Sequence, residues 1–300
     1  MRKLVWIVTL VWFGVLACGR SGDGIDKRLV LATIRPYALI AAEIAGARLR
    51  VETLLPVSAS PHTWSPRPSD VQRISRAGLI IANGLGLEEK LGRFFHDQSA
   101  RTILAADILG TPGREEKHAE GHEDDGHGHG RNTDPHLWTD PVLMVRFAGV
   151  LAKRFGQHDP EGRDLFANNL ISFSNRVMAL DARIRDEAAG YARRAVVTFH
   201  DAFPRLFARY GITRVAALMA TPGKEPSAAE LAGLGRKIRD AGVRALYREP
   251  QMDPRSVNIL AKEYGLPVYS VDPIGQDPGV TNYAALIRYN WEMFAKGFAR

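Results

Sequence analysis

The chain has 300 residues, of which 45% are hydrophobic and 24% charged, a composition that excludes a disordered, collagenous or coiled-coil protein. This length is near the upper limit for one hydrophobic core and therefore favours two lobes. The formal net charge is +7, but no basic run or interleaved aromatic stripe accompanies it, so nucleic acid is not an expected partner.

The amino terminus has the pattern of a secretory signal, predicted over residues 1–17. A short basic head precedes the uncharged run 4–17, which is shorter than the roughly 20 apolar residues of a membrane-spanning helix. A small residue before Cys18 is typical of bacterial lipoprotein processing, so Cys18 is the predicted lipidation site and 18–27 a lipid-anchored tether. An uncleaved anchor, or a signal with an incidental cysteine, is the alternative. Because Cys18 is the only cysteine, a disulfide and a cysteine-based zinc site are excluded.

Apolar runs of strand length alternate with helical stretches after residue 28, as in an α/β fold with mainly parallel strands. The predicted strands are 29–34, 49–55, 79–82 and 102–105 in the first half, and 195–199, 213–218, 244–247 and 267–271 in the second. We therefore expect an N-terminal lobe over 28–158 and a C-terminal lobe over 191–300, each a mainly four-stranded parallel sheet flanked by helices. A Pro-Ser-x-x-Gln/Glu pattern at 68–72 and 226–230 predicts a capping box that begins a helix in each half.

One long rigid helix, predicted over 159–190, is expected to join the lobes. Asp159 is its predicted N-cap and Pro160 its first helical residue. Apolar residues recur at intervals of three and four and predict one buried face: Phe166, Leu170, Phe173, Val177, Leu180, Ile184 and Ala188.

Seven of the nine histidines fall into two populations, and His96 and His158 belong to neither. Four of them lie in an acidic, glycine-rich segment, 114–130: His118, His122, His127 and His129. This segment has almost no apolar residues, so we expect a mobile surface loop whose imidazoles and carboxylates capture zinc weakly. A solvated acidic loop that contains histidine by chance is the alternative.

Three other histidines and one aspartate lie at the ends of predicted elements. His200 ends a strand, His62 follows another in a proline-stiffened loop, His136 precedes the helical stretch 142–155, and Asp272 follows the last strand. The carboxyl ends of parallel strands are where α/β folds place ligands. Three imidazoles and a carboxylate are a reasonable tetrahedral set for Zn²⁺, although any one of them alone is weak support for a metal site.

Several segments resemble those of one family. They are PHTWSPRPSD at 61–70, ANG at 82–84, DPHLWTDP at 134–141, FHDAF at 199–203, EPQ at 249–251 and VDPIG at 271–275. Over nearly its whole mature length the chain is similar to the metal-binding subunits of bacterial ABC importers for zinc and manganese, the cluster A-I solute-binding proteins.

This resemblance implies two α/β lobes joined by a long rigid helix, with one metal held in the cleft by His62, His136, His200 and Asp272. It also implies a membrane permease and its ATPase as partners, and an acidic His-rich loop is typical of the zinc-transporting members. Manganese members usually carry Glu at the position of His200, so we expect Zn²⁺ as the transported ligand and Mn²⁺ as the less favoured one.

The predicted protein is therefore an exported, monomeric lipoprotein, periplasmic or on the cell surface, that captures Zn²⁺ for import. A manganese-type subunit, and an adhesin or storage lipoprotein without an importer, are the alternatives. A zinc hydrolase with Glu249 or Asp201 as general base is a remote alternative, because a fourth ligand at Asp272 would close the coordination position that a catalytic water needs.

Overall fold

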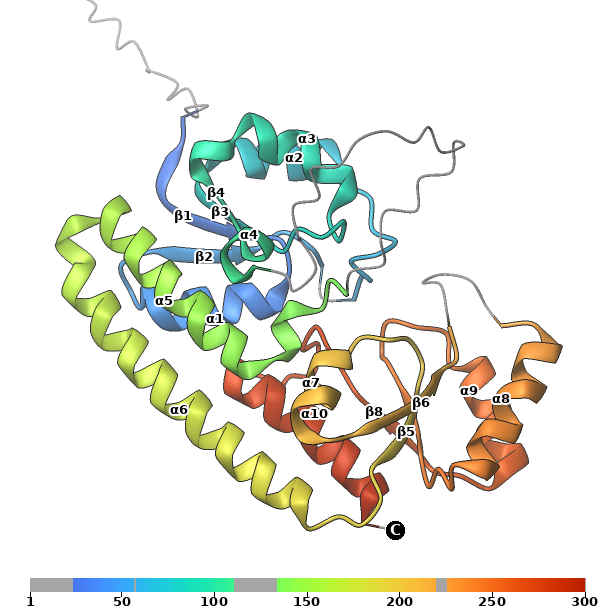
Figure 1. The fold of residues 1–300 in the computed structure, drawn as a ribbon. Helices are drawn as coiled ribbons and strands as arrows, with labels where there is room; N and C mark the ends of the chain where they lie inside the picture. The colour runs from blue at the N-terminus through green and yellow to red at the C-terminus, as the bar shows by residue number, and fades with distance from the viewer. Residues whose placement is uncertain (1–23, 57, 111–133, 220–225, 300) are drawn as a thin grey trace, which may run out of the picture.

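The computed structural model describes residues 24–56, 58–110, 134–219 and 226–299. The predicted signal, Cys18 and the four histidines of segment 114–130 lie outside these residues. In the described part of the chain, two four-stranded sheets form separate lobes, and every strand pairing is parallel. The predicted fold class is confirmed (Figure 1).

The first sheet has the strand order β2-β1-β3-β4. Its strands are β1 (Asp26–Ala32), β2 (Arg50–Thr53), β3 (Ala77–Ala82) and β4 (Thr102–Leu104), with helices α1 (Arg35–Ala45), α2 (Pro68–Arg76), α3 (Gly92–Asp97) and α4 (Ala105–Leu109). The central strand β3 is buried at every residue, as expected for a parallel strand covered on both faces.

The second sheet repeats this arrangement with the order β6-β5-β7-β8. Its strands are β5 (Ala195–Thr198), β6 (Thr213–Ala217), β7 (Leu246–Arg248) and β8 (Val268–Ser270), with helices α7 (Pro204–Tyr210), α8 (Ala228–Asp240), α9 (Arg255–Tyr264) and α10 (Tyr283–Phe298). All eight predicted strands are thus present. Six of them are one to three residues shorter than the apolar runs that predicted them, and β1 and β3 are longer.

The long helix α6 (Arg163–Ala189) runs along one side of the molecule past both lobes (Figure 1). It packs against α5 (Pro141–His158) and α1 on the first lobe, and against α7 and α10 on the second. No helix of the described residues is both long and apolar enough to cross a membrane.

The predicted start of this helix is wrong in one respect. Pro160 begins a short 3-10 turn (Pro160–Gly162), and α6 follows it. The Asp159 side chain does not cap the helix, because its carboxylate instead accepts two hydrogen bonds from the Arg48 guanidinium, at 2.6 and 2.7 Å.

The buried face of α6 contains a charged residue that the apolar stripe does not predict. Five of the seven predicted residues are buried, Leu170 and Leu180 are half-buried, and Asp181 is fully buried. The Asp181 carboxylate accepts hydrogen bonds from Arg209 Nη2 (2.7 Å) and the Tyr210 hydroxyl (3.1 Å), both on α7. Burial alone would raise the pKa of Asp181, but Arg209 outweighs burial and holds it below its ordinary value. The ion pair between Asp181 and Arg209 therefore joins α6 to α7 of the second lobe.

Only one of the two predicted capping boxes forms. At the start of α8, the Ser227 hydroxyl accepts from the Glu230 amide (3.3 Å) and the Glu230 carboxylate accepts from the Ser227 amide (2.7 Å). At the start of α2, Pro68 takes the first helical position, and the Asp70 carboxylate accepts from the Arg67 amide at 2.8 Å. Ser69 therefore lies inside the first turn and is not the cap.

Ser227→Ala is expected to lower the free energy of unfolding by about 1 kcal/mol, because the Glu230 amide loses its acceptor. Chemical denaturation would measure this change. Ser69→Ala is the matched control, since the same sequence pattern there provides no cap, and a change below about 0.5 kcal/mol is expected. Equal losses in both variants would contradict the assignment of the cap.

Candidate metal centre

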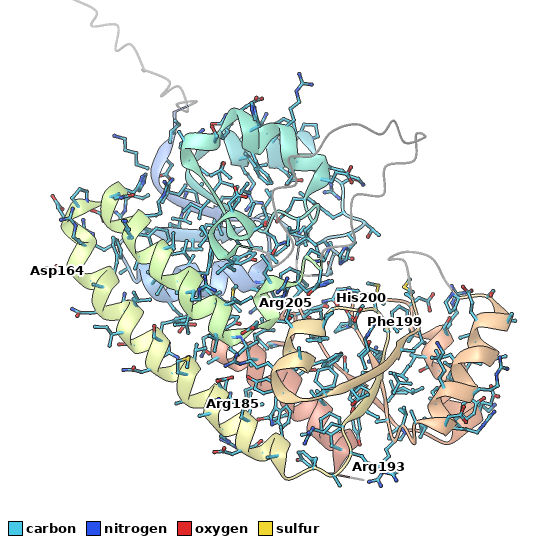
Figure 2. The ribbon with its side chains drawn as sticks, in the orientation of Figure 1. Asp164, Arg185, Arg193, Phe199, His200 and Arg205 are labelled. Carbon is cyan, nitrogen blue, oxygen red and sulfur yellow. The ribbon has the colours of Figure 1, made fainter. Side chains whose placement is uncertain are left out.

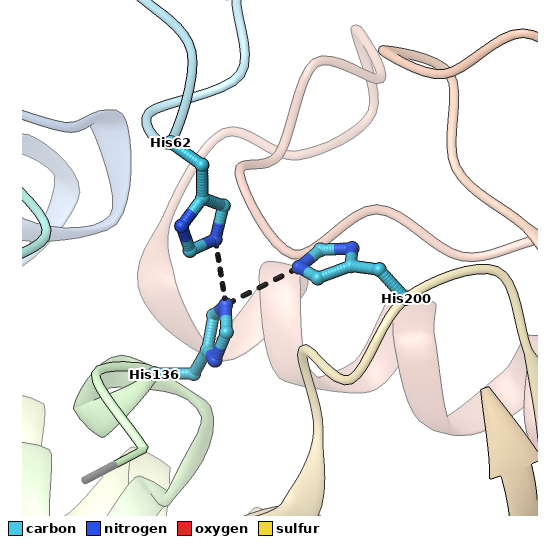
Figure 3. Close-up of side chains that lie close together, drawn as sticks. All are labelled: His62, His136 and His200. Atoms are coloured by element: carbon cyan, nitrogen blue, oxygen red, sulfur yellow. Dashed lines mark hydrogen bonds between the residues drawn. The ribbon is translucent and has the colours of Figure 1, made fainter. Parts of the chain in front are cut away.

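Three histidines from three separate segments converge between the lobes (Figure 3). His62 lies in the loop between β2 and α2, His136 lies just before α5, and His200 lies two residues beyond the end of β5. The Nε2 atom of His136 lies 3.2 Å from His62 Nε2 and 3.3 Å from His200 Nε2. A tetrahedral zinc ion with bonds to nitrogen of about 2.0–2.1 Å has nitrogen–nitrogen edges of about 3.3–3.4 Å. The two edges that meet at His136 Nε2 therefore have the length expected in a zinc site, and all three ligand atoms lie within 4.8 Å of one another.

Two of these imidazoles have a carboxylate partner on the other ring nitrogen. His136 Nδ1 lies 2.8 Å from Asp134 Oδ1, and His200 Nδ1 lies 2.6 Å from Glu249 Oε1. An ionised carboxylate only accepts, so each Nδ1 carries the proton and each Nε2 keeps its lone pair for a metal. Both carboxylates thus fix the tautomer that binds a cation.

Strand order explains why Glu249 meets His200. The strands β5 and β7 are neighbours, and His200 and Glu249 are the second and first residues beyond their carboxyl ends. The sequence offers Glu249 as a general base in the hydrolase alternative, and its position beside His200 is not predicted from the sequence. The β5-β7 pairing could not be deduced from the order of strands along the chain.

The segment that carries His136 is bonded to the second lobe. Arg205 of α7 places its Nε 3.1 Å from Asp134 Oδ2, and its Nη2 donates to the Asp134 carbonyl (3.3 Å). Two residues beyond His136, the Trp138 indole donates to the Pro273 carbonyl at 2.8 Å. Figure 2 shows Arg205 and His200 close together at the boundary between the lobes. These contacts hold His136 beside His200.

The environment shifts the pKa of two imidazoles in opposite directions. Burial, and then the neighbouring His136 and His200, lower the pKa of His62 to about 3, so His62 is neutral at physiological pH. Burial also opposes protonation of His200, but the charge and hydrogen bond of Glu249 outweigh it and raise the pKa of His200 above its ordinary value.

The structure brings together three of the four predicted ligands, and Asp272 is not among them. The Asp272 side chain is fully buried, and its two oxygens accept hydrogen bonds from the backbone amides of residues 274–277 and from Gln251 Nε2 (3.0 Å). The turn after β8 thus wraps around this carboxylate and supplies most of its hydrogen bonds in the structure without a metal. Direct binding of a metal by Asp272 stays a prediction.

A small cavity of about 10 Å³ adjoins the three imidazoles. Its lining includes Ser60, Trp138, Glu249, Gln251 and Ile274. This volume corresponds to about one water-sized sphere, so an ion or a single water fits.

Zinc affinity is expected to fall about tenfold per pH unit once the pH drops below the raised pKa of His200, because zinc must then displace a proton. His62 does not contribute between pH 7.5 and 5.5, since its pKa of about 3 lies below this range. Competition titrations at several pH values would measure the decline. In Glu249→Gln the decline should begin at lower pH, and an unchanged onset would contradict the role of Glu249.

The two lobes, the connecting helix and the buried imidazole cluster define a protein that binds a metal ion between its lobes. Residues 30–297 match the family model described as "Zinc-uptake complex component A periplasmic", and the chain belongs to this family.

Curated relatives agree with this assignment, and solved structures share the fold. The chain is 27% identical to the zinc-binding lipoprotein AdcA of Streptococcus pneumoniae over 280 residues, which are 91% of this chain and 56% of AdcA. It is 25% identical over 312 residues to the manganese ABC transporter substrate-binding lipoprotein PsaA of the same species, over 99% of both chains. The periplasmic zinc binding protein TroA from Treponema pallidum has the same fold, with a TM-score of 0.79, 22% identity, and coverage of 92% of this chain and 100% of TroA.

The protein is thus the substrate-binding component of a metal ABC transporter and not an enzyme, which removes the hydrolase alternative. Like these relatives, the protein is an exported lipoprotein that is anchored to a membrane.

Proposed function

We propose that the transported metal is Zn²⁺, held between the lobes by His62, His136 and His200 and delivered to a membrane permease with its ATPase. Asp272 is the proposed fourth ligand. The observation that carries this proposal is the nitrogen-only cluster, with Nε2 atoms 3.2 and 3.3 Å apart. Imidazole nitrogens suit Zn²⁺, whereas Mn²⁺ prefers carboxylate, carbonyl and water oxygens. A manganese-type subunit is the alternative, because PsaA is named for manganese.

Uptake by cells is the decisive experiment, because most nitrogen-rich sites bind zinc more tightly than manganese in a test tube. A strain that lacks this chain should lose uptake of radioactive zinc at low zinc supply and keep its manganese uptake. Loss of manganese uptake alone would favour the alternative. Unchanged uptake of both metals would favour an adhesin or storage role.

We also propose the organisation expected from the sequence. This comprises a signal over 1–17, a tether over 18–27, the lobes 28–158 and 191–300 with helix 159–190 between them, and a monomeric state. The strand β1 begins at Asp26, so it includes the last two residues of the expected tether. The histidines of segment 114–130 would supply weaker zinc capture.

Cys18→Ala is expected to release the protein from the membrane or leave its signal unprocessed, because stable anchoring requires two hydrophobic chains on a processed cysteine. Membrane fractionation and mass spectrometry of the amino terminus would measure this result. An unchanged membrane fraction with residues 4–17 still attached would favour an uncleaved anchor.

A further inference from the structure

A hollow with basic walls lies at the amino edge of the first sheet, where the parallel strands begin. Its volume is about 570 Å³, and its lining includes Lys27 and Arg28 of β1, Arg48 just before β2, and His158 at the end of α5. His158 Nε2 donates to the Lys27 carbonyl at 2.5 Å, so the end of α5 closes the hollow against β1. The three histidines of the metal centre lie at the opposite edge, since His62 follows the carboxyl end of β2.

Two cations of this hollow are not neutralised by a carboxylate. Lys27 is exposed and forms no ion pair in the part of the chain that the structure describes. Arg28 donates from Nε and Nη2 to the carbonyls of Arg48 and Ala47, at 3.2 and 3.3 Å. Asp159, the carboxylate in the lining, is already paired with Arg48 at 2.6 Å. The positive charges of Lys27 and Arg28 therefore remain available to an anion.

Further arginines extend this charge along the same edge. Arg76 directly precedes β3 and is exposed. Arg101 directly precedes β4, and its guanidinium donates to the carbonyls of Ser75 and Ala77. Arg154 of α5 donates to the Ala100 carbonyl at 3.3 Å. These oxygens carry no net charge, so the arginines stay cationic partners for a ligand.

We call these cations the basic edge: Lys27, Arg28, Arg76, Arg101 and Arg154. Strand register brings its two halves together, because Asp26 of β1 lies opposite Ala77 of β3. The carboxylate of Asp26 does not cancel the charge of its neighbours, since it pairs with Arg50 at 2.9 Å.

The amino-terminal tether leaves the protein at this edge. The strand β1 begins at the end of the first lobe that is farthest from the second lobe (Figure 1). The chain from Cys18, the proposed lipidation site, to Gly24 can extend over at most about 20 Å. A lipid on Cys18 therefore holds the basic edge next to the headgroups, at a high effective concentration of them.

We propose that the basic edge docks on an anionic phospholipid surface, with the phosphate of one headgroup seated in the hollow between Lys27 and Arg28. Lysine and arginine bind phosphate oxygens through charge-assisted hydrogen bonds. The strand β1 is about 20 Å long, so docking at its amino end leaves the three histidines clear of the surface and free to collect metal. This inference goes beyond the proposed metal and uses only the lipid anchor proposed for Cys18.

Vesicle binding by the mature chain with Cys18→Ser tests the docking surface, because without a lipid only the protein itself can hold the vesicle. We expect binding to vesicles of phosphatidylcholine mixed with phosphatidylglycerol, and none to phosphatidylcholine alone. Salt should abolish this binding, since the Debye length falls from about 10 Å at 0.1 M to about 3 Å at 1 M. Equal binding to both vesicles, or binding to neither, would overturn the inference and leave the proposed metal transport intact.

A matched pair of double variants separates the basic edge from net charge. Lys27→Gln with Arg76→Gln should weaken binding to the anionic vesicles about 30-fold, because each basic residue near such a surface strengthens binding about fivefold. Lys237→Gln with Lys262→Gln is the control, since it removes the same charge from exposed residues of α8 and α9 in the second lobe. Equal losses in the two double variants would contradict the inference. Zinc affinity should equal that of the parent protein in both.

The orientation of the lipidated protein provides a second, independent test. Lipidation consumes the thiol of Cys18, so a cysteine introduced by Gln157→Cys, beside the hollow, or by Asn258→Cys, on α9, is the one free thiol for a fluorophore. Energy transfer to an acceptor on the lipid headgroups should be larger from position 157 than from position 258. This difference should shrink at high salt. Equal transfer from both positions at low salt would refute docking through the basic edge.

Discussion

His136→Ala is expected to weaken zinc binding at least about a thousandfold. His136 is the central imidazole, with its Nε2 within 3.3 Å of the ligand atoms of both His62 and His200. Structural zinc in zinc-finger peptides is worth roughly 10–16 kcal/mol of binding free energy. On that scale one of three nitrogens contributes about 4 kcal/mol, which is a factor of about a thousand. Competition against a chromogenic chelator at pH 7.5 would measure the change.

The control for this experiment is His96→Ala, because His96 is exposed on α3 and belongs to no cluster of ligands among the described residues. Its zinc affinity should equal that of the parent protein. The melting temperature of metal-free His136→Ala should also be recorded, since His136 is buried and bonded to Asp134. Tight zinc binding that survives in a folded His136→Ala protein would refute the site.

Local patterns in the sequence were sufficient to predict the elements of the fold. Parallel strands in an α/β protein are short apolar runs, and all eight such runs form strands. The spacing of apolar residues likewise predicts α6, but it could not predict the buried Asp181 on the same face. Asp181 is stable there only because Arg209 and Tyr210 of α7 lie opposite, and this is a tertiary contact.

The candidate site was predictable only in part, for the same physical reason. Each of the three histidines stands at the end of an element, so its approximate place follows from local patterns. The hydrogen bonds that Asp272 accepts depend on the backbone of the following turn. In this turn Gly275 has a φ of +80°, and the amides of residues 274–277 point at the carboxylate. Hydrophobic periodicity contains no information about such a turn.

The neighbours of His200 determine how metal selectivity can be changed. A His200→Glu substitution replaces a nitrogen by a hard oxygen and should favour Mn²⁺ relative to Zn²⁺. However, Glu249 lies 2.6 Å from His200 Nδ1 and is almost fully buried, so the single variant would place two carboxylates side by side. Like charges in a buried site raise the pKa of one of them, and the resulting proton would compete with either metal.

The variant that combines His200→Glu with Glu249→Gln avoids this repulsion, because the introduced amide donates a hydrogen bond to the introduced carboxylate. We expect the ratio of the zinc and manganese dissociation constants to move towards manganese by about a hundredfold, or about 2.7 kcal/mol, in this variant. Glu249→Gln alone should weaken the binding of both metals. It should leave the ratio of the two dissociation constants nearly unchanged, because His200 still supplies a nitrogen. Titrations of both metals at pH 7.5 would measure the ratio in the parent protein and in each variant. If the combined variant keeps the ratio of the parent protein, the ligand type at position 200 does not set selectivity, and the spacing of the remaining nitrogens must do so.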